Sequence, residues 1–185
     1  MNIISTQLPG VVILEPEIFG DSRGYFFESW NKEKYEQNEI HVNFIQDNES
    51  LSRFGVLRGL HYQAAPYTQA KLVRVIKGAV LDVAVDIRHG SPTFGKHVAV
   101  ELNEQNKRQI FVPRGFAHGF AVLSEEAIFA YKCDNRYMPS HERGIAYNDP
   151  ALGIDWRITP EQAILSDKDR RNPMLAEAEA LSCEQ

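Results

Sequence analysis

Short apolar runs, many of them alternating with polar residues, fill the chain up to about residue 150. The clearest run is 80–88, in which apolar residues occupy one parity and a mixed set, including Asp82 and Asp86, occupies the other. A period of two places successive side chains on opposite faces of a strand, so one face should be apolar and the other mixed. Lys77-Gly78, just before this run, suits a hairpin turn.

Comparable runs recur along the chain with Gly, Pro, Asn and Asp between them. They are 11–19, 24–30, 56–63, 71–76, 96–102, 109–112, 119–123 and 127–133. Regularly spaced short strands are typical of a β-sandwich or barrel. The sequence therefore predicts a mostly β protein.

Helices are expected in three places. The polar segment 31–40 predicts a short helix, although its capping signals are weak. Thr159, Pro160 and Gln162 combine an N-cap, a proline at the first helical position and a capping-box partner, which predicts a second helix. A third should begin at Asn172-Pro173 and continue to Leu181.

Composition narrows the class of protein. A chain of 185 residues can bury one sizeable core, so we expect a single domain over 1–185. A formal net charge of -5 gives no general attraction for nucleic acid or an anionic membrane. No cation precedes Arg23 and no long apolar run is present, which indicates a cytoplasmic protein without a leader or a spanning helix. Cys133 and Cys183 are expected to be reduced and structural.

Two histidine-containing strings carry candidate chemistry. The string 113–120 (PRGFAHGF) fits one half of a cupin signature, and 58–63 (RGLHYQ) stands where the other half should be. Metal-binding cupins have His-x-His there, because a divalent metal needs several converging ligands. Here Gln63 replaces the second His, and the cation Lys71 follows. Strand parity puts Gln63 on the face of His61 and Tyr62 on the opposite face, which predicts a polar pocket without a metal.

Several separated strings together resemble the dTDP-4-dehydrorhamnose 3,5-epimerases. The matching strings are 19–24 with Glu28, 46–48, 58–63, 91–95, 113–120, Tyr131-Lys132, Tyr137, Glu142 and 166–169. One departure is Tyr62, where the family often has Phe. The resemblance implies a cupin-like jelly roll, that is a double-stranded β-helix, with short C-terminal helices. It also implies a cofactor-independent enzyme that epimerises C3 and C5 of dTDP-4-dehydro-6-deoxy-D-glucose to give dTDP-4-dehydro-L-rhamnose.

The chemistry implied by the resemblance starts from the C4 ketone, which acidifies the hydrogens on C3 and C5. His61 matches the base, since imidazole titrates near pH ~6.5 when unperturbed. Asp169 matches the carboxylate that fixes its tautomer. Tyr131 matches the acid on the other face of the sugar, and Lys71 would stabilise the enolate oxygen.

The resemblance also implies residues that bind the nucleotide. Arg23, Arg58 and Lys168 match positions that hold the diphosphate. Glu28, Gln46 and Asn48, with Asp47 between them, are candidates to contact thymine or phosphate, and Tyr137, Phe26 or Phe27 could stack on the base. His118 and Glu142 are expected to contact the ligand in undefined roles. A homodimer is expected, because a family relative supplies residues matching Arg23 and Glu28 across a subunit interface.

Three alternatives remain open at this point. A metal-dependent cupin would use His61 and His118 as ligands, but Gln63 and Lys71 count against it. A non-catalytic binding module would not need His61, Asp169 and Tyr131 together. A relative that epimerises only C3 or only C5 would share the base and the fold, so the sequence does not separate it from the bifunctional enzyme.

Overall fold

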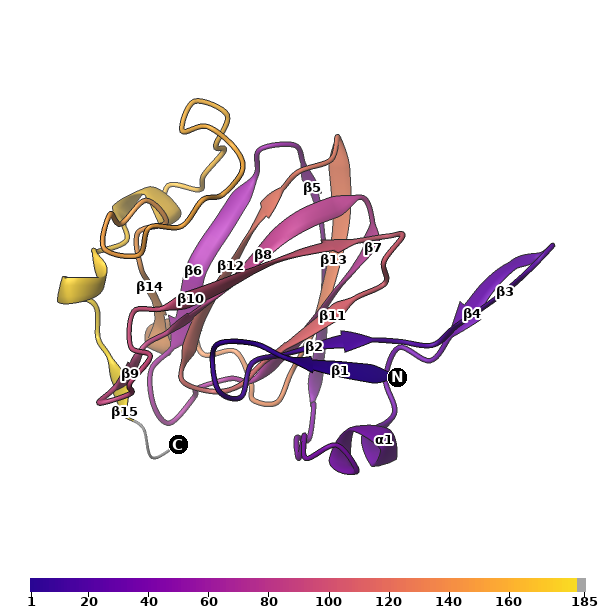
Figure 1. The fold of residues 1–185 in the computed structure, drawn as a ribbon. Helices are drawn as coiled ribbons and strands as arrows, with labels where there is room; N and C mark the ends of the chain where they lie inside the picture. Colours follow the sequence, from indigo (N-terminus) through magenta and orange to yellow (C-terminus); the bar gives the residue numbers. More distant parts are fainter. Residues whose placement is uncertain (183–185) are drawn as a thin grey trace.

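The computed structural model describes residues 1–182, and two β-sheets face each other in it (Figure 1). The six-stranded sheet has the order β1 (Asn2–Ser5), β2 (Val12–Glu15), β11 (Gln109–Val112), β7 (Lys71–Lys77), β13 (Glu126–Cys133) and β5 (Gln46–Arg53). The five-stranded sheet has the order β10 (His97–Asn103), β8 (Ala79–Asp86), β12 (Phe116–Val122), β6 (Leu57–Gln63) and β14 (Glu142–Gly144). All neighbours within these two sheets are antiparallel, which confirms the mostly β, cupin-like jelly roll.

The smaller elements lie at the margins of the sandwich. A separate ribbon is formed by β3 (Ile18–Asp21) and β4 (Gly24–Phe27), and β9 (Arg88–His89) pairs in parallel with β15 (Leu181–Ser182). The helical elements are α1 (Lys32–Glu36) and the 3₁₀ turns η1 (Pro139–His141), η2 (Asp169–Arg171) and η3 (Leu175–Glu177). Within residues 1–182, no helix has the length and apolar character needed to span a bilayer.

The main core fills the space between the two sheets. Phe120 of β12 and Phe129 of β13 stack there with ring centroids 3.9 Å apart. The surrounding side chains are aliphatic, among them Val73, Val80 and Ile110, and all three are fully buried. Burial of this apolar surface is the main stabilising term of the fold.

Both outer faces of the sandwich are also covered. The C-terminal cover, residues 145–182, lies over the outer face of the five-stranded sheet (Figure 1). Its Ile145, Leu152 and Trp156 pack in one buried cluster with Leu81 and Val83 of β8. On the six-stranded sheet, α1 packs Tyr35 against Leu14 and Leu72. The sheets are therefore buried on two sides, and the mixed face of β8 lies inside the protein, where Asp82 and Asp86 are 0% exposed.

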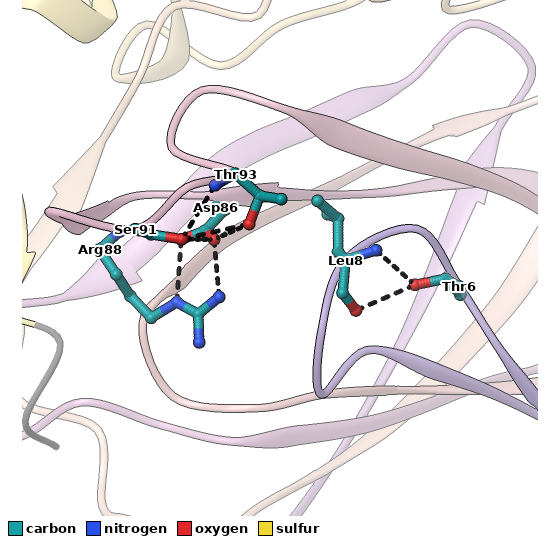
Figure 2. A network of polar contacts seen from close by, with 6 residues as sticks. All are labelled: Thr6, Leu8, Asp86, Arg88, Ser91 and Thr93. Atoms are coloured by element: carbon teal, nitrogen blue, oxygen red, sulfur yellow. Dashed lines mark hydrogen bonds and ion pairs between the residues drawn. The ribbon is translucent and has the colours of Figure 1, made fainter.

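Asp86 organises the loop after β8 (Figure 2). Its carboxylate accepts hydrogen bonds from Arg88 Nε at 2.9 Å, Ser91 Oγ at 2.6 Å and Thr93 Oγ1 at 2.6 Å. Burial raises the pKa of Asp86, but these donors outweigh it and hold the pKa at about 2. The guanidinium carbon of Arg88 lies 4.5 Å from the ring centroid of Phe116. Ser91 and Thr93 of the string 91–95 thus hold the loop on Asp86, and Arg88 connects Asp86 to Phe116 of β12.

Some predicted elements differ from the structure. The predicted strand 11–19 is divided into β2 and β3 around Pro16, which has no N–H to donate to a ladder. The capping-box contact at Thr159 forms, with its N–H donating to Gln162 Oε1 at 2.9 Å, but residues 160–162 form only a turn, so the predicted helix was wrong. The reason is that Ile164 pairs with Val56 of the neighbouring segment.

The predicted helix from Asn172 to Leu181 was also wrong. Only η3 is helical there, because Leu181 N donates to Ile87 O at 3.0 Å and draws the chain into β15. The short C-terminal helices are thus η2 and η3. The predicted helix 31–40 is confirmed over Lys32–Glu36, with Asn31 as its N-cap. Cys183 lies outside the described residues.

Candidate active site

A cavity of about 330 Å³ opens at the end of the sandwich where β6 and β13 end and β5 and β7 begin. Half of the residues predicted for the reaction and for nucleotide binding line it. They are Gln46, Asn48, His61, Lys71, Tyr131, Tyr137 and Glu142. Antiparallel pairing explains this convergence, because it brings the start of one strand beside the end of its neighbour.

His61 and Asp169 form a pair at this cavity. His61 lies on β6 and is 28% exposed, whereas Asp169 opens η2 of the C-terminal cover and is 4% exposed. A carboxylate oxygen of Asp169 hydrogen-bonds with His61 Nε2, and its other oxygen accepts from Ser166 Oγ at 2.8 Å. Burial raises the pKa of Asp169, but the bonds from His61 and Ser166 outweigh it and keep the pKa below its usual range. The carboxylate is thus ionised, so the neutral imidazole carries its proton on Nε2 and leaves Nδ1 basic.

Tyr131 and Lys71 reach the same cavity from the other sheet. Lys71 begins β7, and its Nζ lies 5.9 Å from the ring centroid of Tyr131 on β13. Burial lowers the pKa of Lys71 and raises the pKa of Tyr131. Within residues 1–182, the Lys71 ammonium has neither a hydrogen bond nor an ion pair with the protein. A cation with no hydrogen-bond or ion-pair partner among the described residues therefore faces the cavity together with a protonated phenol.

Tyr137, Glu142 and Lys168 form a polar group at the mouth. The Tyr137 hydroxyl donates to Glu142 Oε2, and Lys168 Nζ forms an ion pair with the same oxygen. The bond to Glu142 raises the pKa of Tyr137 to about 12. Burial raises the pKa of Glu142, but the bonds from Lys168 and Tyr137 outweigh it and the pKa falls below its usual range.

Gln63 lies on the cavity side of β6, next to His61, as strand parity predicted. Its side-chain amide bonds to three backbone groups, with Nε2 donating to Tyr67 O and Arg136 O and Oε1 accepting from Met138 N. Tyr62 packs among the apolar side chains between the five-stranded sheet and the C-terminal cover. Its hydroxyl donates to Glu179 O at 2.6 Å. Residues 1–182 contain no group of three or more His, Cys, Asp or Glu side chains that could hold a metal ion.

Three predicted ligand residues lie near the cavity but bond elsewhere. Asp47 points to the outer face of the six-stranded sheet and pairs with Lys132 at 2.8 Å. Arg58 bonds to Ser52 Oγ at 3.2 Å through its terminal nitrogen. His118 is buried beneath the cavity, where Nε2 contacts both carboxylate oxygens of Asp82 at 2.9 and 3.0 Å.

Arg23 and Glu28 do not line the cavity. The β3–β4 ribbon projects far from the sandwich, and Arg23 at its tip is 88% exposed and pairs with Asp21 (Figure 1). Glu28, at the base of the ribbon, pairs with Lys34 at 2.9 Å. The ribbon also exposes the apolar side chains of Phe19, Tyr25 and Phe26.

Sequence reasoning missed some residues of the cavity wall. Gln69 and Cys133 line it, and the Cys133 thiol is buried, with its pKa raised by burial to about 11. The sequence could have predicted Cys133 in the cavity wall, because it follows Tyr131 by two residues on one strand and residues i and i+2 share a face. Gln69 lies in a loop, where no periodicity indicates direction.

Comparison with known proteins agrees with this geometry. A family model described as dTDP-4-dehydrorhamnose 3,5-epimerase matches residues 5–177. The chain is 53% identical to the dTDP-4-dehydrorhamnose 3,5-epimerase of Pseudomonas aeruginosa and 52% identical to that of Shigella flexneri, each match covering 97% of this chain and 98% of the relative. Its structure matches dTDP-6-deoxy-D-glucose-3,5-epimerase from Legionella pneumophila, solved in complex with dTDP-4-keto-L-rhamnose. That match has a TM-score of 0.95 and 51% identity, and it covers 100% of this chain and 99% of the other.

Proposed function

The chain belongs to the dTDP-4-dehydrorhamnose 3,5-epimerase family, and we propose on this premise that it epimerises dTDP-4-dehydro-6-deoxy-D-glucose at C3 and C5. The product is dTDP-4-dehydro-L-rhamnose. One observation carries the assignment of the catalytic residues: His61, which is paired with Asp169, and Tyr131 enter one cavity from two facing sheets. Inversion of a carbon centre needs a base on one side of the sugar ring and an acid on the other.

His61 is the base in this proposal. Its Nδ1 takes the proton from C3 or C5, and the electron pair left on carbon is delocalised onto the C4 oxygen as an enolate. The ionised Asp169 holds Nε2–H and stabilises the imidazolium that forms. Ser166 holds the carboxylate in turn, so the orientation of the ring is fixed before substrate arrives.

Lys71 and Tyr131 complete the reaction in this proposal. The ammonium of Lys71 stabilises the negative charge on the enolate oxygen, and it is available because no described residue pairs with it. Burial keeps the Tyr131 phenol protonated, so it can return a proton to the carbon from the side opposite His61. The net change at each carbon is the loss of one proton and the gain of another, with no oxidant, reductant or added group.

The nucleotide occupies the mouth of the cavity in this proposal. Arg58 and Lys168 hold the diphosphate, and Gln46, Asn48 and Tyr137 contact the thymidine part. Arg23 and Glu28 act in a homodimer, where the projecting ribbon of one subunit reaches the cavity of its partner. The exposed apolar side chains of the ribbon support this arrangement, because they are unfavourable in water.

We also propose that 1–185 is one domain and that the enzyme is cytoplasmic. The C-terminal cover supports one domain, because it packs on the sheet and supplies Asp169. The buried free thiol of Cys133 is in keeping with a reducing compartment.

Turnover in deuterated water tests the proposed function. The protein is incubated with dTDP-4-dehydro-6-deoxy-D-glucose, and the position of deuterium in the product is read by NMR. Deuterium at both C3 and C5 of a product with L-rhamno configuration is expected. Deuterium at one carbon alone would establish a monofunctional epimerase, and no incorporation would contradict the proposal.

A further inference from the structure

The side chain of Gln63 uses its whole amide group to hold backbone from two separate loops. Gln63 is 4% exposed, and its Nε2 donates to Tyr67 O at 2.6 Å and to Arg136 O at 3.1 Å. Its Oε1 accepts from Met138 N at 2.6 Å. Each such bond stabilises the loops modestly, and a buried partner left unpaired costs more than one bond contributes.

Two of these bonds bracket Tyr137. The carbonyl of Arg136 precedes the Tyr137 residue and the N–H of Met138 follows it, so the Gln63 amide binds the backbone on both sides as a neighbouring strand would. The third bond joins the loop containing Tyr67 to the same amide. Asn135 strengthens this junction, because its Nδ2 donates to Thr68 O at 3.2 Å and its carbonyl accepts from Gln69 Nε2 at 2.7 Å.

The direction of the Tyr137 side chain is fixed at its other end by β14. Glu142, which accepts from the Tyr137 hydroxyl, pairs directly with Gln63 in the register of β14 and β6. Tyr137 is thus held through its backbone by the side chain of Gln63 and through its hydroxyl by the residue beside Gln63. Its ring is half-exposed at the mouth, free to meet a ligand on one side.

We propose that Gln63 is a positioning residue that acts through Tyr137 and sets the affinity for the nucleotide part of the substrate. This inference rests on the proposed function, in which Tyr137 contacts that part. Gln63 touches no reacting atom in this role. Its place beside His61 is a consequence of strand parity, and its amide is engaged by the backbone of the two loops.

A double-mutant cycle tests the inference, with dTDP binding measured by calorimetry. Gln63→Leu and Tyr137→Ala should each weaken dTDP binding by about tenfold, while the kcat of Gln63→Leu falls by less than about threefold. The double variant should bind dTDP within about twofold of Tyr137→Ala, because Gln63 has no effect once the ring is absent. Additive losses of about a hundredfold, or an unchanged Kd in Gln63→Leu, would overturn the inference.

A second measurement separates failure of this inference from failure of the proposed function. In Gln63→Leu, the backbone amide of Met138 loses its acceptor, so its hydrogen exchange should accelerate by about tenfold or more, whether or not dTDP is the ligand. Unchanged exchange would overturn the positioning role directly. Failure of the wild-type protein to bind dTDP would instead count against the proposed function.

Asn106 provides a matched control. Its side-chain amide also bonds to three backbone groups, those of Glu101, Asn103 and Arg108, in a turn outside the cavity wall. Asn106→Leu should therefore lower stability without changing the Kd for dTDP.

If Gln63→Leu does not fold, Gln63→Glu keeps an acceptor for Met138 N but loses both donors, and it should weaken dTDP binding in the same direction.

Discussion

His61 and Asp169 are joined by a hydrogen bond although 108 residues separate them in the sequence. His61 lies near the end of β6 in the five-stranded sheet, and Asp169 lies in the segment that covers the outer face of this sheet. Because the Asp169 carboxylate is ionised, it accepts the proton carried by His61 Nε2. The lone pair of the neutral ring is therefore on Nδ1.

His61→Ala should reduce kcat by about 10²–10⁴, because general base catalysis contributes that much and no second base is assigned to the same side. Asp169→Asn should reduce it by about 10²–10³, since a neutral amide does not stabilise the imidazolium. Steady-state kinetics and dTDP titration check both variants. Near wild-type turnover in His61→Ala would exclude His61 as the base.

Tyr131→Phe should separate proton exchange from inversion. The variant keeps the ring but has no acid opposite His61, so His61 removes a proton and returns a solvent deuteron to the same side. Deuterium should therefore enter C3 or C5 with retained configuration, while net epimerisation falls by about 10² or more. NMR in deuterated water measures both. Inverted product at the wild-type rate would exclude Tyr131 as the acid.

Asp86 should make stability depend on pH in the acid range. Its pKa is about 2 when folded and about 3.9 when unfolded, so its contribution is complete above pH 4 and is lost as the pH falls to 2. The loss should be about 2 kcal/mol in the free energy of unfolding, measured with urea at several pH values. Asp86→Asn should be less stable at pH 7 and should lose this part of the pH dependence. Glu15→Gln, at a partly exposed pair with Arg108, serves as the control with little effect.

Mixing two inactive variants should restore activity if the β3–β4 ribbon serves the partner's cavity. In a heterodimer of Arg23→Ala with His61→Ala, one of the two cavities has both native residues. Random exchange of subunits should therefore recover about a quarter of wild-type activity. No recovery, with light scattering confirming exchanged dimers, would mean that Arg23 acts within its own subunit or has no role.

Treatment with a chelator should leave activity unchanged, because Gln63 replaces the second histidine of a metal-binding cupin and binds backbone groups instead. Activity and metal content are measured before and after exhaustive dialysis against EDTA. Loss of activity that one divalent metal restores would favour the metal-dependent alternative.

The sheets were largely predictable because their burial follows strand parity. Leu81 and Val83 lie on one face of β8, as the alternation predicted. Apolar alternation did not predict β5, because its residues Gln46–Arg53 are mostly polar. This strand lies at the edge of its sheet and exposes every second side chain. The capping contact predicted at Thr159 forms, but the pairing of Ile164 with Val56 leaves only a turn where a helix was predicted.

The site was less predictable from residues alone. Parity placed His61 and Gln63 together, but nothing local connects His61 to Asp169 or brings Tyr131 opposite, and only the matching strings suggested them. From the sequence, Gln63 indicates only that one ligand of a metal-binding cupin is missing. Its bonds to Tyr67, Arg136 and Met138 depend on two loops whose paths no periodicity describes.

The C-terminal cover has a consequence for synthesis on the ribosome. The strand with His61 leaves the ribosome long before Asp169 is translated, a delay on the order of 5–20 s at ordinary elongation rates. During that interval the outer face of the five-stranded sheet, later buried by Trp156 and Leu152, lacks its covering layer. A nascent chain that stops early thus has the imidazole without its carboxylate and an apolar sheet open to chaperones and proteases.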